Sequence, residues 1–353
     1  MRRIGMAAAA ALAPVTLLLT LSLSTACGGG DATPPDASID GNPGGQTYTL
    51  HWGPVEVAPG EEDTRCVTLR LGNDFPIKVH EIHNTLSPGS HHFIVYRLAD
   101  GVEDPTPTPC FPFVDTLDPT KGAPLMITQR SDETLELPPG VAFSLAANQM
   151  VRLEMHFINT SPTETISVEA TSEVHVMADA DFQQDADFLF IGNPDIQLPP
   201  QAGVTQTLGP TYFPMPATLA DVNIFAITGH THALGTDVRV ETVADGTGPG
   251  SSIYAPDPFN WNEPETTFHD PPVTVPAGGG FRFSCDWVND SGHTVGFGES
   301  ANDEMCFFWA YYYPSQGSKV CMHSEMYTAN PIDLCCPDDA VLCALIQEYI
   351  GQL

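Results

Sequence analysis

Short apolar and aromatic runs alternate with polar turn residues over most of the chain. The runs are rich in Val, Ile, Thr, Phe and Tyr, which favour strands, and most of the 33 prolines and 30 glycines lie between them. This pattern predicts an all-β protein built of antiparallel β-sandwiches. From residue 46 onward the predicted strands are TRCVTLRL, HHFIVYRL, VAFSLAA, MVRLEMHFI, ISVEATSEVHV, FLFIG, VNIFAITGHTH, DVRVETV, FRFSCDWV and CFFWAYYYP.

One stretch has a helical period instead. In DDAVLCALIQEYIGQL, residues 338–353, apolar residues recur at spacings of three and four, and Gly351 follows as a stop signal. We therefore expect a short helix at the C-terminal end of the sequence.

The length of the chain favours two domains, because 353 residues exceed the usual size of one hydrophobic core. The polar, acidic stretch ADADFQQDAD at residues 178–187 separates two strand patterns and is the candidate linker. We predict one β-sandwich at residues 46–182, a second at 183–328 and a cysteine-rich helical tail at 329–353. No repeat of fixed period is present, which disfavours solenoids and propellers.

The first 26 residues read as a secretory signal, with a basic start at Arg2 and Arg3, a long apolar stretch and small residues before Cys27. Cys27 lies between LSTA and GGG, a context that resembles a bacterial lipoprotein cleavage box, although the leucine is one position further from the cysteine than is commonest. The resemblance implies acylation of Cys27, and Gly28 implies an outer-membrane address. The alternative is ordinary signal cleavage. Residues 27–45 are rich in Gly, Pro, Asp and Ser and predict a flexible tether.

Charge and cysteine content narrow the possible partners. The 44 acidic residues against 12 basic ones make nucleic-acid binding improbable, because phosphate contacts need clustered Lys and Arg. Nine cysteines in an exported chain indicate disulfides, and eight remain after Cys27 is set aside. No apolar run after the signal is long enough to cross a bilayer, so we expect membrane contact only through a lipid anchor.

Histidines in unusual patterns are the candidate metal ligands. His230 and His232 in GHTHALG are two residues apart, so in a strand both rings leave the same face. His91 and His92 are adjacent and share one ion only if a bulge or an irregular strand start, such as the preceding SPG, turns them together. His156 lies among apolar residues. Each feature alone is also explained by ordinary surface or core histidines.

Met305, in the sequence ANDEMC, changes the choice of metal. Three imidazoles suit copper, zinc or iron, whereas a thioether is a soft donor that selects Cu(I). A set of two histidines and one methionine therefore indicates redox copper. Alone, Met305 would be assigned to core packing.

The order of these motifs resembles a known family, the copper type II, ascorbate-dependent monooxygenases, which include dopamine β-hydroxylase and peptidylglycine α-hydroxylating monooxygenase. The likeness runs from about residue 50 to residue 315. The matching motifs, in order, are TRCVTLRL, the HH pair, LPPGVAF, RLEMHFIN, HTHALG and NDEMC. The combination of HTH-x-LG with DEMC is the most specific.

The resemblance implies two copper ions per chain, in two jelly-roll-like sandwiches that face each other across a solvent-filled cleft. It implies an electron-donating copper in the first sandwich and a dioxygen-binding copper in the second, refilled by ascorbate or a similar external reductant. It also implies two disulfides. The residues concerned are His91, His92 and His156 for the first copper, His230, His232 and Met305 for the second, and the pairs Cys66–Cys110 and Cys285–Cys306.

Two positions depart from the peptide-acting branch of the family. That branch has an arginine two residues before its HTH motif, to hold a peptide carboxylate, where this chain has Thr228. It has an asparagine two residues after the ligand methionine, where this chain has Phe307. A peptide C-terminus is therefore not the expected substrate. RLEMHFIN and the YYYP run are closer to the dopamine β-hydroxylase branch, which does not establish a shared substrate.

Other polar and sulfur-containing residues receive structural interpretations. We expect Asp303 and Glu304 to orient their loop by hydrogen bonding. His80 and His83 are read as solvated strand residues, with an accessory copper site as the alternative. We expect the last four cysteines to pair with one another and to hold the C-terminal helix to the second domain, with a second metal site as the alternative: Cys321, Cys335, Cys336 and Cys343.

The sequence therefore predicts an exported copper-dependent monooxygenase that inserts one atom of O₂ into a C–H bond of a small organic substrate. The alternative from another class is a non-catalytic copper-binding lipoprotein used for metal capture or transfer. A β-sandwich for carbohydrate binding or adhesion, with incidental histidines, is a third interpretation that leaves six matching donors unexplained.

Overall fold

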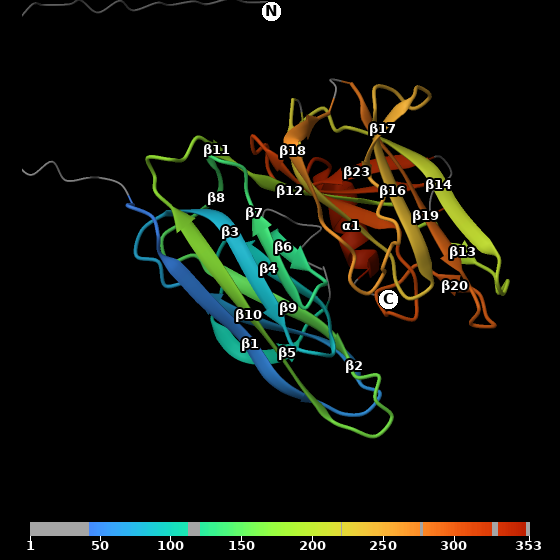
Figure 1. The fold of residues 1–353 in the computed structure, drawn as a ribbon, viewed down its shortest axis with the longest axis horizontal. Helices are drawn as coiled ribbons and strands as arrows, with labels where there is room; N and C mark the ends of the chain where they lie inside the picture. The colour runs from blue at the N-terminus through green and yellow to red at the C-terminus, as the bar shows by residue number, and fades with distance from the viewer. Residues whose placement is uncertain (1–41, 112–120, 220, 276–277, 327–330, 351–353) are drawn as a thin grey trace, which may run out of the picture. The chain divides into compact units, whose positions relative to one another are not determined.

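The computed structural model describes residues 42–111, 121–219, 221–275, 278–326 and 331–350. Contacts divide the chain between Asp40 and Gly41, and the description below concerns the unit that begins at Gly41. Apart from one helix, the regular structure of the described residues is strand. Cys27, the signal and most of the predicted tether lie outside the described residues. Figure 1 labels the strands used below.

The strands β1 to β11 form two sheets, which we call the N-terminal strand group. One sheet has the order β1-β10-β3-β8-β11, with β7 paired to β3, and the other has the order β5-β2-β9-β4-β6. The first sheet contains β1 (Thr47–Val57), β3 (Ile77–Leu86), β7 (Asp132–Glu136), β8 (Val141–Leu145), β10 (Ile166–Met177) and β11 (Gln184–Asp185). The second contains β2 (Glu62–Arg70), β4 (Ser90–Leu98), β5 (Asp104–Pro109), β6 (Gly122–Thr128) and β9 (Met150–Ile158).

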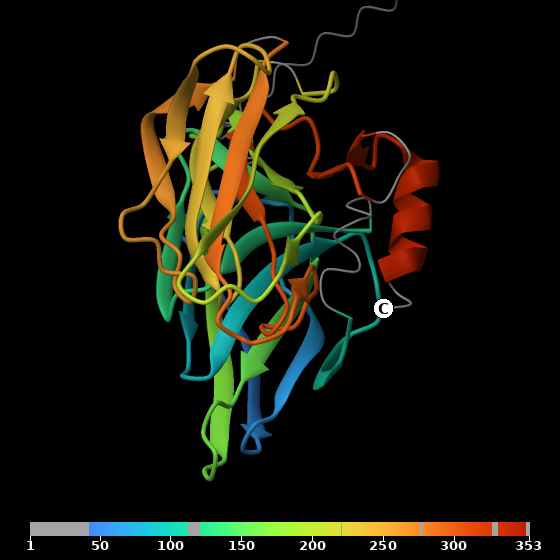
Figure 2. The same ribbon diagram turned by 90° about the vertical axis from the view of Figure 1, so that its right-hand side faces the viewer.

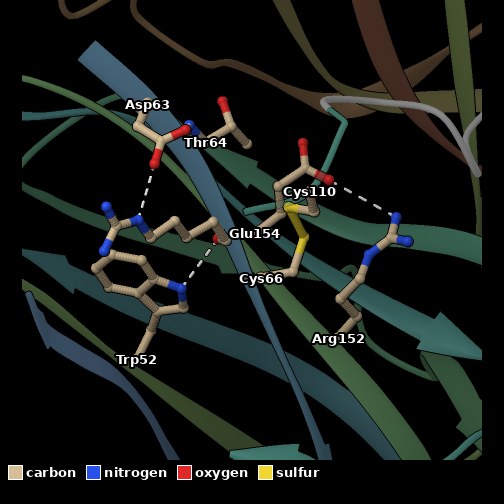
Figure 3. Close-up of a disulfide and its surroundings, with 8 residues drawn as sticks. Trp52, Asp63, Thr64, Cys66, Cys110, Arg152 and Glu154 are labelled. Carbon is tan, nitrogen blue, oxygen red and sulfur yellow. Dashed lines mark hydrogen bonds and ion pairs between the residues drawn. A yellow bond between two sulfur atoms is a disulfide. The ribbon is translucent and has the colours of Figure 1, made fainter. Parts of the chain in front are cut away.

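These two sheets pack face to face as a sandwich. The alternating burial of β10 gives one face to the core and one to solvent. Trp52 of β1 crosses between the sheets, because its ring lies 5.9 Å from that of Phe157 and its Nε1 donates to the carbonyl oxygen of Arg65 at 3.1 Å. Figure 3 shows Trp52 together with the Cys66–Cys110 disulfide.

The strands β12 to β23 form the C-terminal strand group. Its largest sheet has the order β18-β15-β21-β12-β22-β23, a second has the order β14-β19-β16-β17, and β13 pairs with β20. The largest sheet contains β12 (Asp187–Gly192), β15 (Asn223–His230), β18 (Thr267–Thr274), β21 (Phe307–Tyr313), β22 (Lys319–Ser324) and β23 (Ile332–Cys336). The others contain β13 (Gln197–Leu198), β14 (Thr205–Pro214), β16 (Gly235–Val243), β17 (Gly250–Tyr254), β19 (Gly280–Val288) and β20 (Val295–Gly296).

Aromatic side chains join the two larger sheets of this group. The ring of Phe308 in β21 lies 5.3 Å from that of Phe281 and 5.4 Å from that of Phe283, both in β19. The helix α1 (Ala340–Ile350) follows β23, and Figure 2 shows it to one side of the strands. The all-β fold class with a short C-terminal helix is therefore confirmed.

Sheet pairing changes within the predicted linker. β11 ends at Asp185 and pairs with β8, whereas β12 begins at Asp187 and pairs with β21 and β22. The two strand groups share one hydrophobic cluster, in which Leu125 and Ile127 of β6 are grouped with Trp309 and Tyr311 of β21. The backbone N–H of Ile127 donates to Tyr311 Oη at 3.1 Å. The domain boundaries predicted from the sequence stay a prediction.

Candidate metal centre

Two neighbouring strands bring His91, His92 and His156 together. In the antiparallel pair β4 and β9, His92 lies directly opposite His156, and the register shifts between Ser90 and His92. His91 is the extra residue of this bulge, which lets both adjacent histidines approach the same partner. One possible ligand atom from each ring lies within 4.8 Å of the others. All three side chains are buried.

A carboxylate fixes the ring of His156. Its Nε2 lies 2.9 Å from Oε1 of Glu62, the first residue of β2. The hydrogen bond from His156 is the main reason that the pKa of Glu62 is lowered to about 2, so this oxygen is a charged acceptor and Nε2–H is the donor. Nδ1 of His156 then carries the free lone pair, and this buried atom has no hydrogen-bond partner. The same is true of His91 Nε2.

His230 and His232 lie where β15 ends, with ring centroids 5.0 Å apart. Nδ1 of His230 donates to Oε1 of Gln129 at 2.9 Å, and Nδ1 of His232 donates to the carbonyl oxygen of Asp303 at 3.2 Å. Each ring therefore keeps Nε2 for a ligand, since the hydrogen bond at one nitrogen fixes the role of the other.

A buried carboxylate shapes the turn after His230. Glu304 accepts hydrogen bonds from the backbone N–H of His232 at 2.9 Å and of Leu234 at 2.7 Å, and from Trp287 Nε1 at 2.7 Å. Burial raises the pKa of Glu304 to about 7, against the lowering effect of these donors. At Gly235 a Cβ would come within 1.8 Å of Thr231 Oγ1, so the turn requires glycine there.

Met305 lies directly after Glu304, is buried, and precedes β21 by two residues. His230 pairs with Phe307 in the β15–β21 ladder, so the same register carried two residues further puts Met305 opposite His232. The disulfide between Cys306 and Cys285 of β19 holds this segment to the neighbouring sheet. Met305 thus lies at the same sheet end as the histidine pair.

The two sets are close to each other. The rings of His91 and His232 have centroids 5.8 Å apart, and Trp261, from the segment between β17 and β18, lies 6.0 Å from His91. The six candidate donor residues are each 4% exposed or less. The solvent-filled cleft that the family resemblance implied between the sets stays a prediction.

Burial keeps these imidazoles neutral. It is the largest cause of the strongly lowered pKa values of His91, His92 and His230, and the neighbouring histidines add to it. The pKa of His232 is lowered to about 4, again chiefly by burial. A metal ion binds the neutral ring, so these environments favour ligation over protonation.

The residues fit copper. Buried ring nitrogens without hydrogen-bond partners are costly unless something binds them, and His91 Nε2 and His156 Nδ1 both point to such a ligand. Three imidazoles in one set, and two imidazoles beside a buried thioether in the other, are donors that copper accepts in both of its oxidation states. The role of these residues as ligands stays a prediction.

The remaining candidates do not join the site. His83 is bound by Asp132 at 3.1 Å and Glu173 at 3.4 Å on the face of the β3 sheet. Among the described residues, the other cluster with metal-ligand spacing consists of Cys66, Cys110 and Glu154, whose sulfurs form a disulfide. Figure 3 shows Arg152 reaching the Glu154 carboxylate beside that disulfide, at 3.7 Å.

The described part of the chain contains four disulfides. Two are the pairs that the resemblance implied, Cys66–Cys110 and Cys285–Cys306. The last four cysteines pair with one another, and the second of these bonds ties α1 to β23: Cys321–Cys335 and Cys336–Cys343. Disulfides of this number favour an oxidising compartment, as for an exported protein. None of the helices in the described ranges is long and apolar enough to span a bilayer.

Sequence reasoning missed several residues that contact the candidate ligands, among them Glu62, Gln129 and Trp261. None carries a local motif. Glu62 is separated from His156 by 94 positions and Gln129 from His230 by 101. The sequence signal closest to them is the histidine pattern itself, since metal-ligating histidines usually bond a second acceptor.

Comparison with known proteins identifies part of the chain. Residues 184–330 match the family described as copper type II ascorbate-dependent monooxygenase, C-terminal domain. The match confirms the family resemblance inferred from the motifs. A chain from the solved structure of infectious bursal disease virus Gt strain is 10% identical over 86% of this chain and 77% of that chain, with a TM-score of 0.17, which carries no argument about fold or function.

Proposed function

We propose that this protein is an exported copper monooxygenase, because residues 184–330 match the C-terminal domain of the copper type II ascorbate-dependent monooxygenases. It hydroxylates a C–H bond of a small organic substrate with O₂ and an ascorbate-like reductant. His91, His92 and His156 hold one copper ion, and His230, His232 and Met305 hold the other. The observation that carries the proposal is the meeting of His91, His92 and His156 within 4.8 Å, close to His230 and His232. Hydrogen bonds already occupy one ring nitrogen in each of His156, His230 and His232.

The overall reaction balances as R–H + O₂ + 2 electrons + 2 protons giving R–OH + H₂O. Bound copper supplies one-electron transfer and a site for dioxygen. The chain's own residues hold the rings in place: Glu62 fixes His156, Gln129 fixes His230, and Asp303 and Glu304 fix His232. Burial of all six donor residues excludes bulk water from the metal surroundings.

The residues near His230 support a substrate without a terminal carboxylate. Thr228 Oγ1 is hydrogen-bonded to Thr266 Oγ1 at 2.8 Å, and Thr266 Oγ1 donates to Glu133 at 2.6 Å. Thr228 is therefore linked through Thr266 to a largely buried carboxyl group and supplies no positive charge to pair with a substrate carboxylate. Phe307 packs against Phe190 with ring centroids 5.0 Å apart, so it offers an apolar surface.

The experiment counts copper in the purified chain and measures reductant-driven O₂ uptake with a panel of amines, phenols and amides. We expect two copper ions per chain and uptake that rises with one substrate class, with hydroxylated product in proportion to the oxygen consumed. Met305→Ala should abolish substrate-dependent uptake. Met326→Ala, an exposed methionine away from the histidines, is the matched control and should leave uptake unchanged.

Two results would contradict the proposal. Tight copper binding without uptake stimulated by any substrate would favour the non-catalytic carrier lipoprotein. Unchanged copper content in a His230→Ala, His232→Ala double variant would remove the ligand assignment itself.

The anchor is a separate part of the proposal, in which Cys27 is acylated and holds the protein at the outer membrane. We expect the wild-type chain in the membrane fraction of a bacterial host and Cys27→Ser in the soluble fraction. Equal distribution of the two variants would contradict the lipid anchor without affecting the metal assignment.

A further inference from the structure

One carboxylate touches residues that support both metal-binding sets. Glu62 Oε1 accepts the Nε2–H of His156 at 2.9 Å and the backbone N–H of Ala301 at 3.0 Å. Its other oxygen accepts from Ser300 Oγ at 3.3 Å. His156 belongs to the N-terminal strand group, whereas Ser300 and Ala301 precede β21 of the C-terminal group. Glu62 therefore joins a candidate ligand of the first set to a loop of the second.

That loop leads directly to the second set. The backbone N–H of Asp303 donates to the carbonyl of Ser300 at 2.9 Å, and the carbonyl of Asp303 accepts from His232 Nδ1 at 3.2 Å. The next residues are Glu304, which bonds the backbone of His232 at 2.9 Å, and then Met305. A shift of the Ser300 turn would consequently move the acceptor of His232 and the thioether donor together.

The contacts of Glu62 suit a fixed link. Its side chain is 25% exposed, and both of its carboxylate oxygens accept hydrogen bonds. Hydrogen bonds to an ionised acceptor are stronger than those between neutral groups. Glu62 begins β2, which pairs with β9 from Glu62 to Arg70, so its backbone is held in the same sheet as His156.

We propose that Glu62 is a positioning residue that couples the two metal sites. Metal bound by the first set fixes the ring of His156, and this ring fixes the Glu62 carboxylate. The carboxylate in turn holds Ser300 and Ala301. The loop that they begin, which carries Asp303, Glu304 and Met305, is thereby ordered. Filling the first set raises the metal affinity of the second, and by linkage the reverse holds equally. The inference rests on the proposed function only in requiring that both sets bind copper.

The test is a Cu(I) titration of the purified metal-free chain without oxygen, against a competing chelator. Copper–sulfur scattering in X-ray absorption reports the second set, because Met305 is the thioether donor of the pair. The single variant His156→Ala empties the first set. Relative to the wild type, it should weaken copper binding at the second set by at least about fivefold, the lower end of the affinity changes usual for coupled sites. In a Glu62→Ala background, His156→Ala should weaken it no further.

The matched control is Glu61→Gln. Glu61 is the preceding residue and the same residue type, but it accepts from the Ala58 backbone N–H at 2.8 Å and pairs with Arg65 at 3.4 Å, away from both sets. This variant should keep the full coupling. Glu62→Gln, which keeps an oxygen acceptor but no charge, should keep part of it.

A second measurement does not depend on the affinity of the second set. We expect one equivalent of Cu(I) to slow hydrogen exchange at the backbone amides of Ala301 and His232 in a Met305→Ala chain, where copper binds the first set. Adding Glu62→Ala should remove that protection. A merely structural role for Glu62 would make these amides exchange faster with or without metal and leave no metal-dependent difference to lose.

The outcomes separate the two proposals. If neither set binds copper, the proposed function is wrong. If both sets bind copper and His156→Ala leaves the second set unchanged, or if Glu62→Ala keeps the coupling, the copper assignment stands and the coupling through Glu62 is overturned.

Discussion

The two candidate metal-binding sets are held in different ways. The first is built into a sheet: His92 and His156 face each other in the β4–β9 ladder, and a bulge adds His91. The second is built around a turn beyond the end of β15, where Glu304 binds two backbone N–H groups and the Cys285–Cys306 disulfide holds the segment next to Met305. The register of a ladder is maintained by many hydrogen bonds, whereas the turn depends on a few side chains.

This difference predicts which changes stay local. Losing one ligand of the first set should leave its strands paired, because the backbone ladder does not depend on the imidazoles. Losing a support of the second set should disturb the backbone and the ligands together. The four predictions below test that contrast, from the largest expected effect to the smallest.

Removal of one imidazole from the sheet-built set should have the largest effect on metal content. His156→Ala should lower bound copper from two ions per chain to one, with the copper–sulfur signal retained, while thermal unfolding of the metal-free chain changes little. Copper analysis and X-ray absorption check this. Retention of both ions would show that His156 is not a ligand.

Removal of the Glu304 carboxylate should destabilise the fold most. Glu304→Ala leaves two buried backbone donors and the indole N–H of Trp287 without an acceptor, which should lower the free energy of unfolding by about 3 to 5 kcal/mol. Urea denaturation of the metal-free chain measures it. Glu304→Gln keeps one acceptor oxygen and should cost less. Equal stability of the alanine variant and the wild type would mean that the turn does not need this carboxylate.

Removing either the Cys285–Cys306 or the Cys66–Cys110 disulfide should lower the stability of the fold, but only the removal of the first should also affect copper binding. The bond between Cys285 and Cys306 closes a loop of 21 residues, and that between Cys66 and Cys110 one of 44. Serine at both cysteines should therefore cost about 3 kcal/mol in the first case and about 4 kcal/mol in the second. Copper binding at His232 and Met305 should weaken only in the variant that lacks the Cys285–Cys306 disulfide. A weaker second site in the Cys66, Cys110 variant would contradict the contrast.

The smallest effect concerns pH. Burial raises the pKa of Glu133 to about 7, above the ordinary value of 4.5. The folded chain then binds more protons than the unfolded chain between these values, so the wild type loses stability as pH rises from 4.5 to 7. Glu133→Gln should remove that loss, a relative gain of about 1 to 2 kcal/mol at pH 8 after allowance for partial exposure.

Urea denaturation at pH 5 and pH 8 measures the Glu133 effect. Glu136→Gln, an exposed residue of the same strand, is the control and should show no such difference between the two pH values. A Glu133→Gln variant with the same pH dependence as the wild type would contradict the prediction. Because Glu133 accepts from Thr266 of the other strand group, the experiment also reports on contact between the groups.

The sequence predicted what depends on local pattern. Strand-forming runs and turn residues predicted the all-β fold class, since each run can pair only in extended form, and the period of the final segment predicted α1. The spacing of His230 and His232, and the irregular start before His91, indicated rings that could meet, but each feature alone is also explained by ordinary histidines, and the ligand sets came from the family resemblance. These features involve residues near one another or within one ladder.

What the sequence did not predict depends on packing between distant segments. Ala301 is 239 positions from Glu62, and nothing in either neighbourhood indicates their hydrogen bond. Trp261 follows no motif and reaches His91 only through the path of the β17–β18 connection. The family resemblance also does not fix the separation of the two sets. The 5.8 Å between His91 and His232 reflects how β4 and β15 are placed by the whole fold.

The bulge at His91 has a consequence for how such a centre is inherited. In a regular strand the side chains of two neighbouring residues point to opposite faces of the sheet, so His91 and His92 would be separated. The three histidines can meet here only because β4 has one residue more than the part of β9 that it pairs with. Deleting Ser90 would restore the regular alternation of side chains and direct the rings of His91 and His92 to opposite faces, although every histidine would remain. Preservation of this chemistry therefore depends on strand length as strictly as on ligand identity.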